Sequence, residues 1–152
     1  MTVEEILREA IQGEQEAYEL YTNAADLVQA EHIKALLRDL AQEELGHKAN
    51  LERMLADPQQ LSWQVENLRS SRVEDYRVSD HLVAQPLGPD ADFQDVCIFA
   101  AKREQESYTL YKELAAQSSG RVRDLLEAMA QDELRHKNLV ERWYEEIVYQ
   151  DF

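Results

Sequence analysis

The chain repeats one pattern of residues in its two halves, and this repeat constrains the fold more than any other feature of the sequence. Each half carries a glutamate that is followed about 30 residues later by a Glu-x-x-His motif. The residues are Glu14, Glu44 and His47 in the first half, and Glu104, Glu133 and His136 in the second. Around them, residues 12–21 align with 102–111 at an offset of 90, and residues 40–48 align with 129–137 at an offset of 89. The repeat predicts a duplicated helical hairpin.

Hydrophobic periodicity predicts four long helices, over residues 3–28, 31–56, 92–117 and 120–149. Thr2-x-x-Glu5 has the form of a capping box at the start of the first helix, and Asp57-Pro58 ends the second. Apolar residues recur every three or four positions along each helix, and all six residues of the repeated pattern lie on these apolar faces. The predicted fold class is all-α: a four-helix bundle made of two duplicated hairpins, in a single domain over residues 1–152.

Residues 57–91 form a connection that differs from the rest of the chain. They contain all three prolines and show no sustained hydrophobic period, although residues 61–68 would allow a short helical or extended piece. At about 35 residues the segment is long for a connection. A crossover explains this length. If the second and third helices run parallel, the chain between them must travel the height of the bundle, which is about 30 Å for a 20-residue helix.

Four glutamates and two histidines on buried helix faces need a physical explanation. Burying an unpaired carboxylate costs on the order of several kcal/mol, so such residues rarely persist for packing alone. Two divalent cations would balance the charge of four carboxylates, and neutral imidazoles would complete the coordination. A single Glu-x-x-His motif is a weak signal, but two at matched repeat positions predict a two-metal site. The alternative is a bundle that keeps polar core residues without metal.

Composition narrows the remaining function classes. The 152-residue chain has 31 acidic and 16 basic residues, and its net charge of −15 repels nucleic acid and anionic membranes. No apolar run approaches the roughly 18 residues of a transmembrane helix, and the N-terminus lacks the features of an export signal. The single cysteine, Cys97, cannot form an internal disulfide or a four-thiolate iron centre. We expect a cytoplasmic protein that binds neither nucleic acid nor membranes.

The pattern resembles that of the ferritin-like superfamily, and within it that of rubrerythrin-related proteins. The resemblance covers all four helices and rests on Ala10, Ile11, Glu14, Ala17 and Tyr21 in the first. In the fourth, Asp132-Glu133-x-Arg135-His136 also resembles the signature of di-iron oxygenases and reductases. The resemblance implies a ferritin-like bundle and a site for two iron ions, although manganese and zinc also suit such ligands. The implied ligands are Glu14, Glu44, His47, Glu104, Glu133 and His136.

The resemblance also implies redox chemistry with hydrogen peroxide or dioxygen. The chain has no Cys-x-x-Cys pairs for a rubredoxin-type iron centre, so electrons would come from an external donor protein. Ser107 stands where rubrerythrins carry an additional glutamate, which leaves the choice of oxidant open. The alternatives are ferrous-iron oxidation for storage or delivery, and a metal-binding module without turnover. By the same resemblance we expect a homodimer, with Trp63, Leu68 and Tyr76 of the crossover as the candidate contact.

Several residues beside the six are candidates for supporting roles. Glu43 and Asp132 each precede a repeated glutamate, and could accept a hydrogen bond from a ligand imidazole; the alternative is a solvated helix surface. Tyr21 and Tyr111 lie seven residues beyond a repeated glutamate, and could donate to ligand carboxylates or quench radicals. The remaining candidates are expected to have other roles: Tyr18 and Tyr108 in the core, Cys97 as an apolar filler, Glu16, Glu19 and Glu106 on the surface, and His32 and His81 without a metal role.

Overall fold

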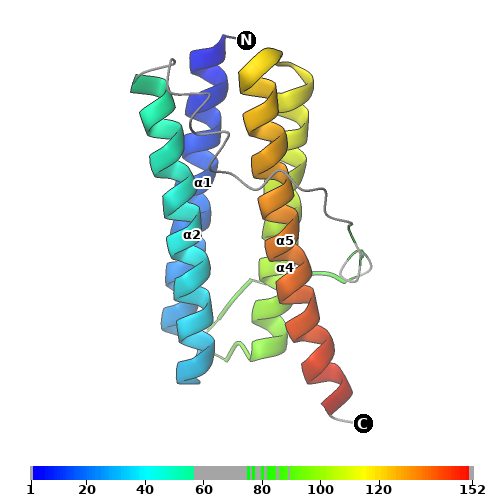
Figure 1. Ribbon diagram of the computed structural model, residues 1–152. Helices are drawn as coiled ribbons and strands as arrows, with labels where there is room; N and C mark the ends of the chain where they lie inside the picture. The colour runs from blue at the N-terminus through cyan, green and yellow to red at the C-terminus, as the bar shows by residue number, and fades with distance from the viewer. Residues whose placement is uncertain are drawn as a thin grey trace.

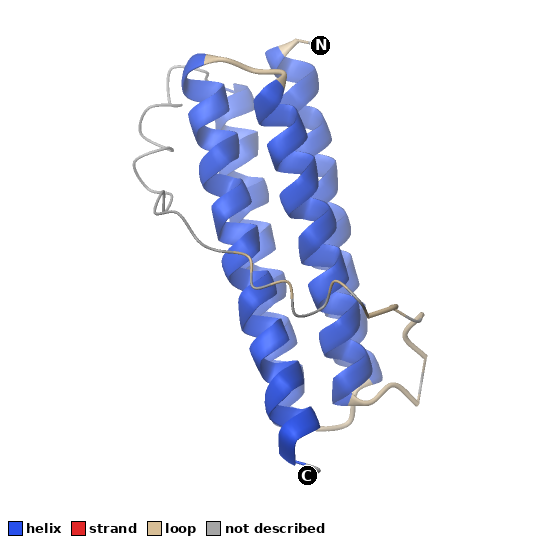
Figure 2. Ribbon diagram, turned by 90° about the vertical axis from the view of Figure 1, so that its right-hand side faces the viewer, coloured by secondary structure: helices blue, strands red, loops and turns tan. Residues whose placement is uncertain are grey.

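The computed structural model contains four α-helices and, among the residues it describes, no strand (Figures 1 and 2). The helices are α1 (Val3–Leu27), α2 (Glu31–Ala56), α4 (Phe93–Ala116) and α5 (Gly120–Gln150). The structure describes residues 2–56, 75, 77, 80, 82–84, 86–88 and 90–150. Each helix begins and ends within one residue of the range expected from the sequence. The predicted fold class, a ferritin-like four-helix bundle, is confirmed.

Two of the helix starts follow local hydrogen-bonding signals in the sequence. At the start of α1, the Glu5 N–H donates to Thr2 Oγ1 at 3.1 Å, and the Thr2 N–H donates to Glu5 Oε2 at 3.0 Å. Asp92 and Asp95 form the same reciprocal pair at the start of α4. Such caps satisfy N–H groups that have no partner within the helix. Because each of these signals spans only four residues, it can be recognised without knowledge of the tertiary structure.

The two hairpins are arranged so that α2 and α4 run in the same direction (Figure 1). The helix α1 runs away from the N-terminus and α2 returns toward it, while α4 begins at the end of the bundle opposite to that at which α2 ends. The connection must therefore cover the height of the bundle, which accounts for its length. The expected contacts of Trp63, Leu68 and Tyr76, and the expected piece over residues 61–68, lie outside the described residues.

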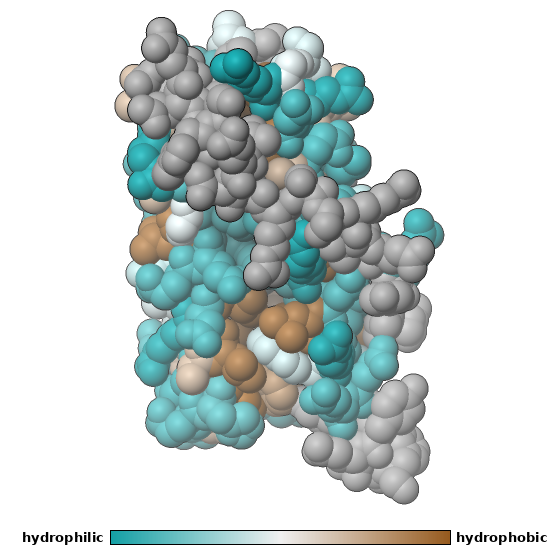
Figure 3. All heavy atoms as spheres, in the orientation of Figure 1, coloured by the Kyte–Doolittle hydropathy of each residue, from teal (hydrophilic) through white to brown (hydrophobic). Residues whose placement is uncertain are grey.

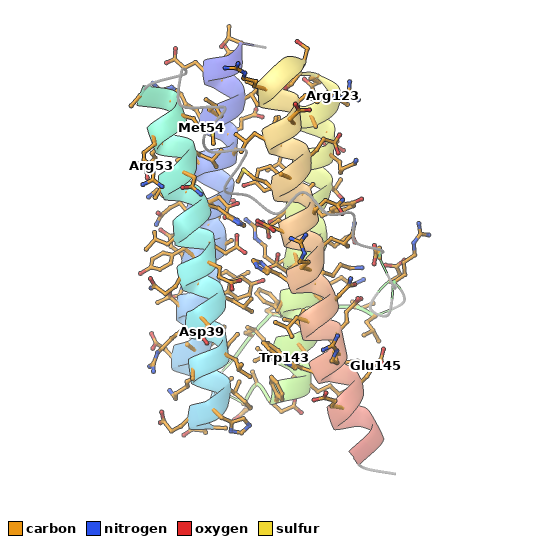
Figure 4. All side chains as sticks on the ribbon, viewed as in Figure 1. Asp39, Arg53, Met54, Arg123, Trp143 and Glu145 are labelled. Atoms are coloured by element: carbon orange, nitrogen blue, oxygen red, sulfur yellow. The ribbon has the colours of Figure 1, made fainter. Side chains whose placement is uncertain are left out.

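The buried core consists of two apolar clusters separated by a polar layer at mid-height. Packing is most extensive within each hairpin, between α1 and α2 and between α4 and α5, and α1 also contacts α4. One cluster includes Leu7, Leu51, Met54, Leu126 and Met129, and the other includes Val28, Ile33, Leu37, Leu40 and Val140. In Figure 4, the labelled Met54 and Trp143 lie on either side of mid-height. Each fully buried side chain of this size contributes about 1.5–3 kcal/mol, which offsets the cost of the polar layer.

A buried lysine of α5 forms an ion pair with Asp75 of the crossover. Lys137 is 0% exposed, and its Nζ lies 2.6 Å from Asp75 Oδ1 and 3.5 Å from Glu141 Oε2. Its repeat counterpart Lys48 instead donates to Gln15 Oε1 at 2.5 Å, from a partly buried position. Nothing in the sequence pattern marks Lys137, because Asp75 lies in a segment without helical periodicity. The ion pair is a feature that only the tertiary structure shows.

The outer surface is largely polar. On the face shown in Figure 3, hydrophilic residues predominate, and apolar surface appears mainly in the lower half between α2 and α5. Among the helices that the structure describes, none combines the length and apolar character needed to cross a membrane.

Candidate metal centre

The six residues of the repeated pattern converge in the polar layer. All four glutamates and His47 are buried, and the side chain of His136 is 13% exposed. Polar side chains project into the space between α2 and α5 at mid-height in Figure 4. Residues three apart lie on adjacent turns of one helix face, so each Glu-x-x-His motif delivers both side chains to the same layer. The contributions are Glu14 from α1, Glu44 and His47 from α2, Glu104 from α4, and Glu133 and His136 from α5.

These side chains form two overlapping groups of four potential ligands, and within each group the ligand atoms lie within 4.8 Å of one another. The first group is Glu14, Glu44, His47 and Glu133, and the second is Glu44, Glu104, Glu133 and His136. We call them the His47 position and the His136 position. Glu44 and Glu133 belong to both, so they would serve as ligands at either position if it held a cation. The imidazole rings stack with their centroids 6.1 Å apart.

The carboxylates have hydrogen-bonding and charge requirements that cations would meet. In each of the four glutamates, Oε2 is buried and has no hydrogen-bond partner. An unsatisfied buried acceptor costs about 1–3 kcal/mol, and more when it is charged. Negative charges gathered in one buried layer also repel one another. Divalent cations with oxygen and nitrogen ligands remove both costs, so the residues present fit a metal site.

Two buried tyrosines connect the hairpins, because each donates a hydrogen bond to a carboxylate of the opposite one. Tyr21 of α1 donates to Glu104 Oε1 at 2.5 Å, and Tyr111 of α4 donates to Glu14 Oε1. Each tyrosine also belongs to one of the apolar clusters. Burial, followed by the charge of the neighbouring carboxylates, raises the pKa of both phenols well above the usual value. Both hydroxyls therefore stay protonated and act as donors.

Glu43 and Asp132 contact the outer nitrogens of the histidines, again across the hairpins. His136 Nε2 lies 2.5 Å from Glu43 Oε2, and His47 Nε2 lies 3.3 Å from Asp132 Oδ2. Arg135 in turn donates to Asp132 Oδ1. When Nε2–H donates outward, Nδ1 of each ring faces the glutamates and is the atom that would bind a metal. Asp132 makes this contact from a largely buried position, whereas the side chain of Glu43 both contacts an imidazole and is 56% exposed.

Protons and cations compete for the atoms of this site. Burial, followed by the charge of Glu14, raises the pKa of Glu44 to about 7. Burial and the surrounding carboxylates raise the pKa of Glu133 well above its usual range. Burial alone would lower the pKa of His47 and His136, but hydrogen bonds to the carboxylates around them and the charges of these groups outweigh it, so both pKa values lie well above 6.5. A divalent cation would displace protons from these groups.

Chelation of bound metal is expected to destabilise the protein, and to do so more strongly as the pH rises. Glu44 and both histidines have folded-state pKa values above the unfolded ones. A group that binds its proton more tightly in the folded state than in the unfolded one makes stability fall as the pH rises from its unfolded pKa through its folded pKa. For Glu44 this range runs from 4.5 to about 7, and the histidines continue the fall above 6.5, while metal binding strengthens. Thermal midpoints with and without chelator should differ more at about pH 8 than at about pH 6. An unchanged midpoint at pH 8 would contradict this.

The other residues considered from the sequence lie outside the two ligand groups. Tyr18 and Tyr108 are partly buried against the apolar clusters. Cys97 is buried, and burial raises the pKa of its thiol to about 12, which suits an apolar filler. His32 is exposed, and His81 lies outside the described residues. The glutamates expected on the surface are exposed: Glu16, Glu19 and Glu106.

Comparison with known proteins agrees with this arrangement. The model of the rubrerythrin family matches residues 5–84 and 95–151, which include all six residues of the ligand groups. No curated protein matches the chain. Among solved structures, a hypothetical protein from Pyrococcus furiosus has a TM-score of 0.62 at 22% identity, over 99% of this chain and 92% of that one, which supports the fold alone. Because the family match covers most of both hairpins and the ligand groups between them, this chain belongs to the rubrerythrin family.

Proposed function

We propose that the protein is a di-iron oxidoreductase that reduces hydrogen peroxide or dioxygen with electrons from an external donor protein. The observation that carries this proposal is the overlap of the two ligand groups, in which Glu44 and Glu133 are shared. Two adjacent redox metals suit the two-electron reduction of an O–O bond. Carboxylate and imidazole ligands accept iron, manganese and zinc, and membership of the rubrerythrin family supports iron.

The side chains hold the ligand atoms in place. Bound ferrous ions would supply one electron each to the substrate. Tyr21 and Tyr111 bind Oε1 of Glu104 and Glu14, so Oε2 of each carboxylate is left for a metal. Because the phenols are themselves fixed among apolar side chains, these carboxylates have little freedom to rotate. The apolar clusters on both sides of the layer keep bulk water away from the ligand atoms.

Protons have a short route between the site and solvent. Reduction of peroxide consumes two electrons and two protons and releases two molecules of water. His136 links the interior to Glu43, whose side chain is 56% exposed, through Nε2. His47 links it in the same way to Asp132, which is 15% exposed. These pairs are the groups through which we expect protons to enter.

Oxidation kinetics of the fully reduced, iron-loaded protein test the proposal. Metal content is first measured on protein purified without added metal, and two irons per chain are expected in the loaded protein. Rapid reoxidation by peroxide in stopped flow would support scavenging. Reoxidation by oxygen with iron retained as mineral would instead indicate ferrous-iron oxidation for storage. Reoxidation by neither would indicate a metal-binding module without turnover.

The partners and compartment are also proposals. A net charge of −15 disfavours nucleic acid and anionic membranes as partners. From the resemblance to rubrerythrins we propose a donor protein and a second copy of the chain as partners, in the cytoplasm. Size-exclusion chromatography with light scattering should give the mass of a dimer. A monomer at micromolar concentration would contradict the proposed homodimer.

Ser107→Glu is expected to raise, several-fold, the ratio of the peroxide to the oxygen reoxidation rate. Ser107 is buried one turn beyond Glu104, and its repeat counterpart Ala17 is also buried and small. Three residues along a helix return to within about 60° of the starting direction, so a glutamate here would add an oxygen donor beside the metals. Metal stoichiometry should not change. Ser107→Gln, which has the same size but no charge, is the control. An unchanged ratio would show that peroxide selectivity is set elsewhere.

A further inference from the structure

The two histidines have unequal surroundings, although the repeat makes them equivalent. His136 Nε2 lies 2.5 Å from Glu43 Oε2, whereas His47 Nε2 lies 3.3 Å from Asp132 Oδ2. A charge-assisted N–H···O hydrogen bond usually measures about 2.7–2.9 Å, so only the first contact is short. Asp132 also accepts a hydrogen bond from Arg135, through its other oxygen. The outer carboxylate of His47 is thus paired with a cation.

The repeat counterpart of Arg135 is a glycine. Gly46 follows Glu43 by three residues, as Arg135 follows Asp132. It therefore has no side chain with which to contact Glu43. Gly46 is exposed, and no atom lies within 4 Å of the place where its Cβ would be. A Cβ could therefore be added there without displacing a neighbour, and arginine favours a helix more than glycine does.

This difference changes the strength of the two imidazoles as ligands. A carboxylate that accepts the outer N–H of an imidazole makes the inner nitrogen a better donor to a metal. A cation on that carboxylate weakens the effect, because it competes for the same negative charge. Glu43 is more exposed than Asp132, so water screens its charge more strongly. The hydrogen bond to the imidazole acts over a shorter range than this screening, and it is shorter at Glu43 than at Asp132. Nδ1 of His136 is therefore the stronger donor.

We propose that Arg135 makes the two metal positions unequal, by weakening His47 as a ligand through Asp132. The His136 position, completed by Glu104, then binds a divalent cation more tightly and fills first. The inference rests on the proposed function in that both positions must bind metal. Arg135 acts on His47 through Asp132 and is a positioning residue.

Cobalt titrations of variants that keep one position each test this proposal. Glu104→Gln retains the His47 position, and Glu14→Gln retains the His136 position. Removing a partner of a metal-bound histidine typically changes affinity by about 10–100-fold. We expect Co²⁺ to bind on the order of tenfold more tightly to the Glu14→Gln variant than to the Glu104→Gln variant. The visible absorption of bound Co²⁺ reports both occupancy and coordination.

Two further substitutions remove the cation from the outer carboxylate of His47 or add one beside the outer carboxylate of His136. Arg135→Ala should tighten Co²⁺ binding by about tenfold in the Glu104→Gln background and leave it unchanged in the Glu14→Gln background. Gly46→Arg should weaken binding by a similar factor in the Glu14→Gln background alone. Structural damage would not tighten Co²⁺ binding. Tighter binding in the Arg135→Ala variant would therefore show that Arg135 changes the strength of His47 as a ligand and does not only support the structure. If Arg135→Ala fails to fold, Gly46→Arg decides the question, since the added Cβ meets no neighbouring atom at this exposed position.

The outcomes distinguish this inference from the proposed function. Equal responses to Arg135→Ala in both backgrounds would reflect general electrostatics and overturn the role of Arg135. If wild type binds two Co²⁺ ions, but Arg135→Ala and Gly46→Arg leave the affinity of both positions unchanged, the role of Arg135 is wrong and the proposed metal centre stands. Wild type that binds no Co²⁺ would overturn the metal centre itself.

Discussion

Glu133→Gln is expected to remove both bound metal ions, whereas Glu14→Gln is expected to remove one. Glu133 belongs to both ligand groups, while Glu14 belongs only to the His47 position. A neutral amide of the same size cannot bridge two cations or balance their charge. Elemental analysis of the two variants, loaded under the same conditions as wild type, should therefore give different stoichiometries. Equal metal content in both variants would contradict the bridging role of Glu133.

The metal-free Glu133→Gln variant should remain folded. Burial and the charges of the other glutamates raise the pKa of Glu133 well above its usual range, so this carboxyl is costly to ionise where it lies. The amide carries no charge and avoids that cost. In the presence of chelator the thermal midpoint of the variant should equal or exceed that of wild type at about pH 8. A lower midpoint would show that loss of metal follows from loss of structure.

Lys137→Met is expected to lower the free energy of unfolding by about 3–5 kcal/mol, the usual cost of removing one partner of a buried ion pair. Lys137 is 0% exposed, and Asp75 and Glu141 both lie within 3.5 Å of its ammonium group. Methionine fills a similar volume but leaves these two carboxylates without that cation. Urea unfolding followed by circular dichroism measures the change.

The repeat provides a matched control for this substitution. Lys48 occupies the equivalent position in the first hairpin and donates to the neutral amide oxygen of Gln15. Lys48→Met removes one partly buried hydrogen bond and should cost only about 1 kcal/mol. Equal destabilisation by the two substitutions would indicate that the contact between the crossover and α5 contributes little to stability.

The helices could be predicted from the sequence because their determinants are local. Apolar residues at helical spacing mark the faces that must be buried, and the Thr2–Glu5 capping box marks the start of α1 within four residues. The duplication adds a second, independent copy of each signal. Membership of the polar layer was predictable for the same reason: a charged residue such as Glu44 on an apolar face has to lie in the core.

The pairing of these residues across the bundle could not be predicted in this way. The sequence indicates that Tyr21 and Tyr111 lie on the buried faces, but not that each one binds a glutamate of the other hairpin. The same holds for Glu43 and Asp132, which contact the histidine of the opposite hairpin. Helix periodicity gives the direction of a side chain about its own axis only.

The sequence by itself thus determined the all-α fold, the four helices and the six residues of the polar layer. The tertiary structure decided which carboxylates belong to both ligand groups and which carboxylate contacts the outer nitrogen of each histidine. It also decided that the buried Lys137 pairs with Asp75. The physical reason is the range of the interactions. Caps and helix faces depend on neighbours within one or two turns, whereas these contacts join residues more than 60 positions apart and depend on how the two hairpins and the crossover pack.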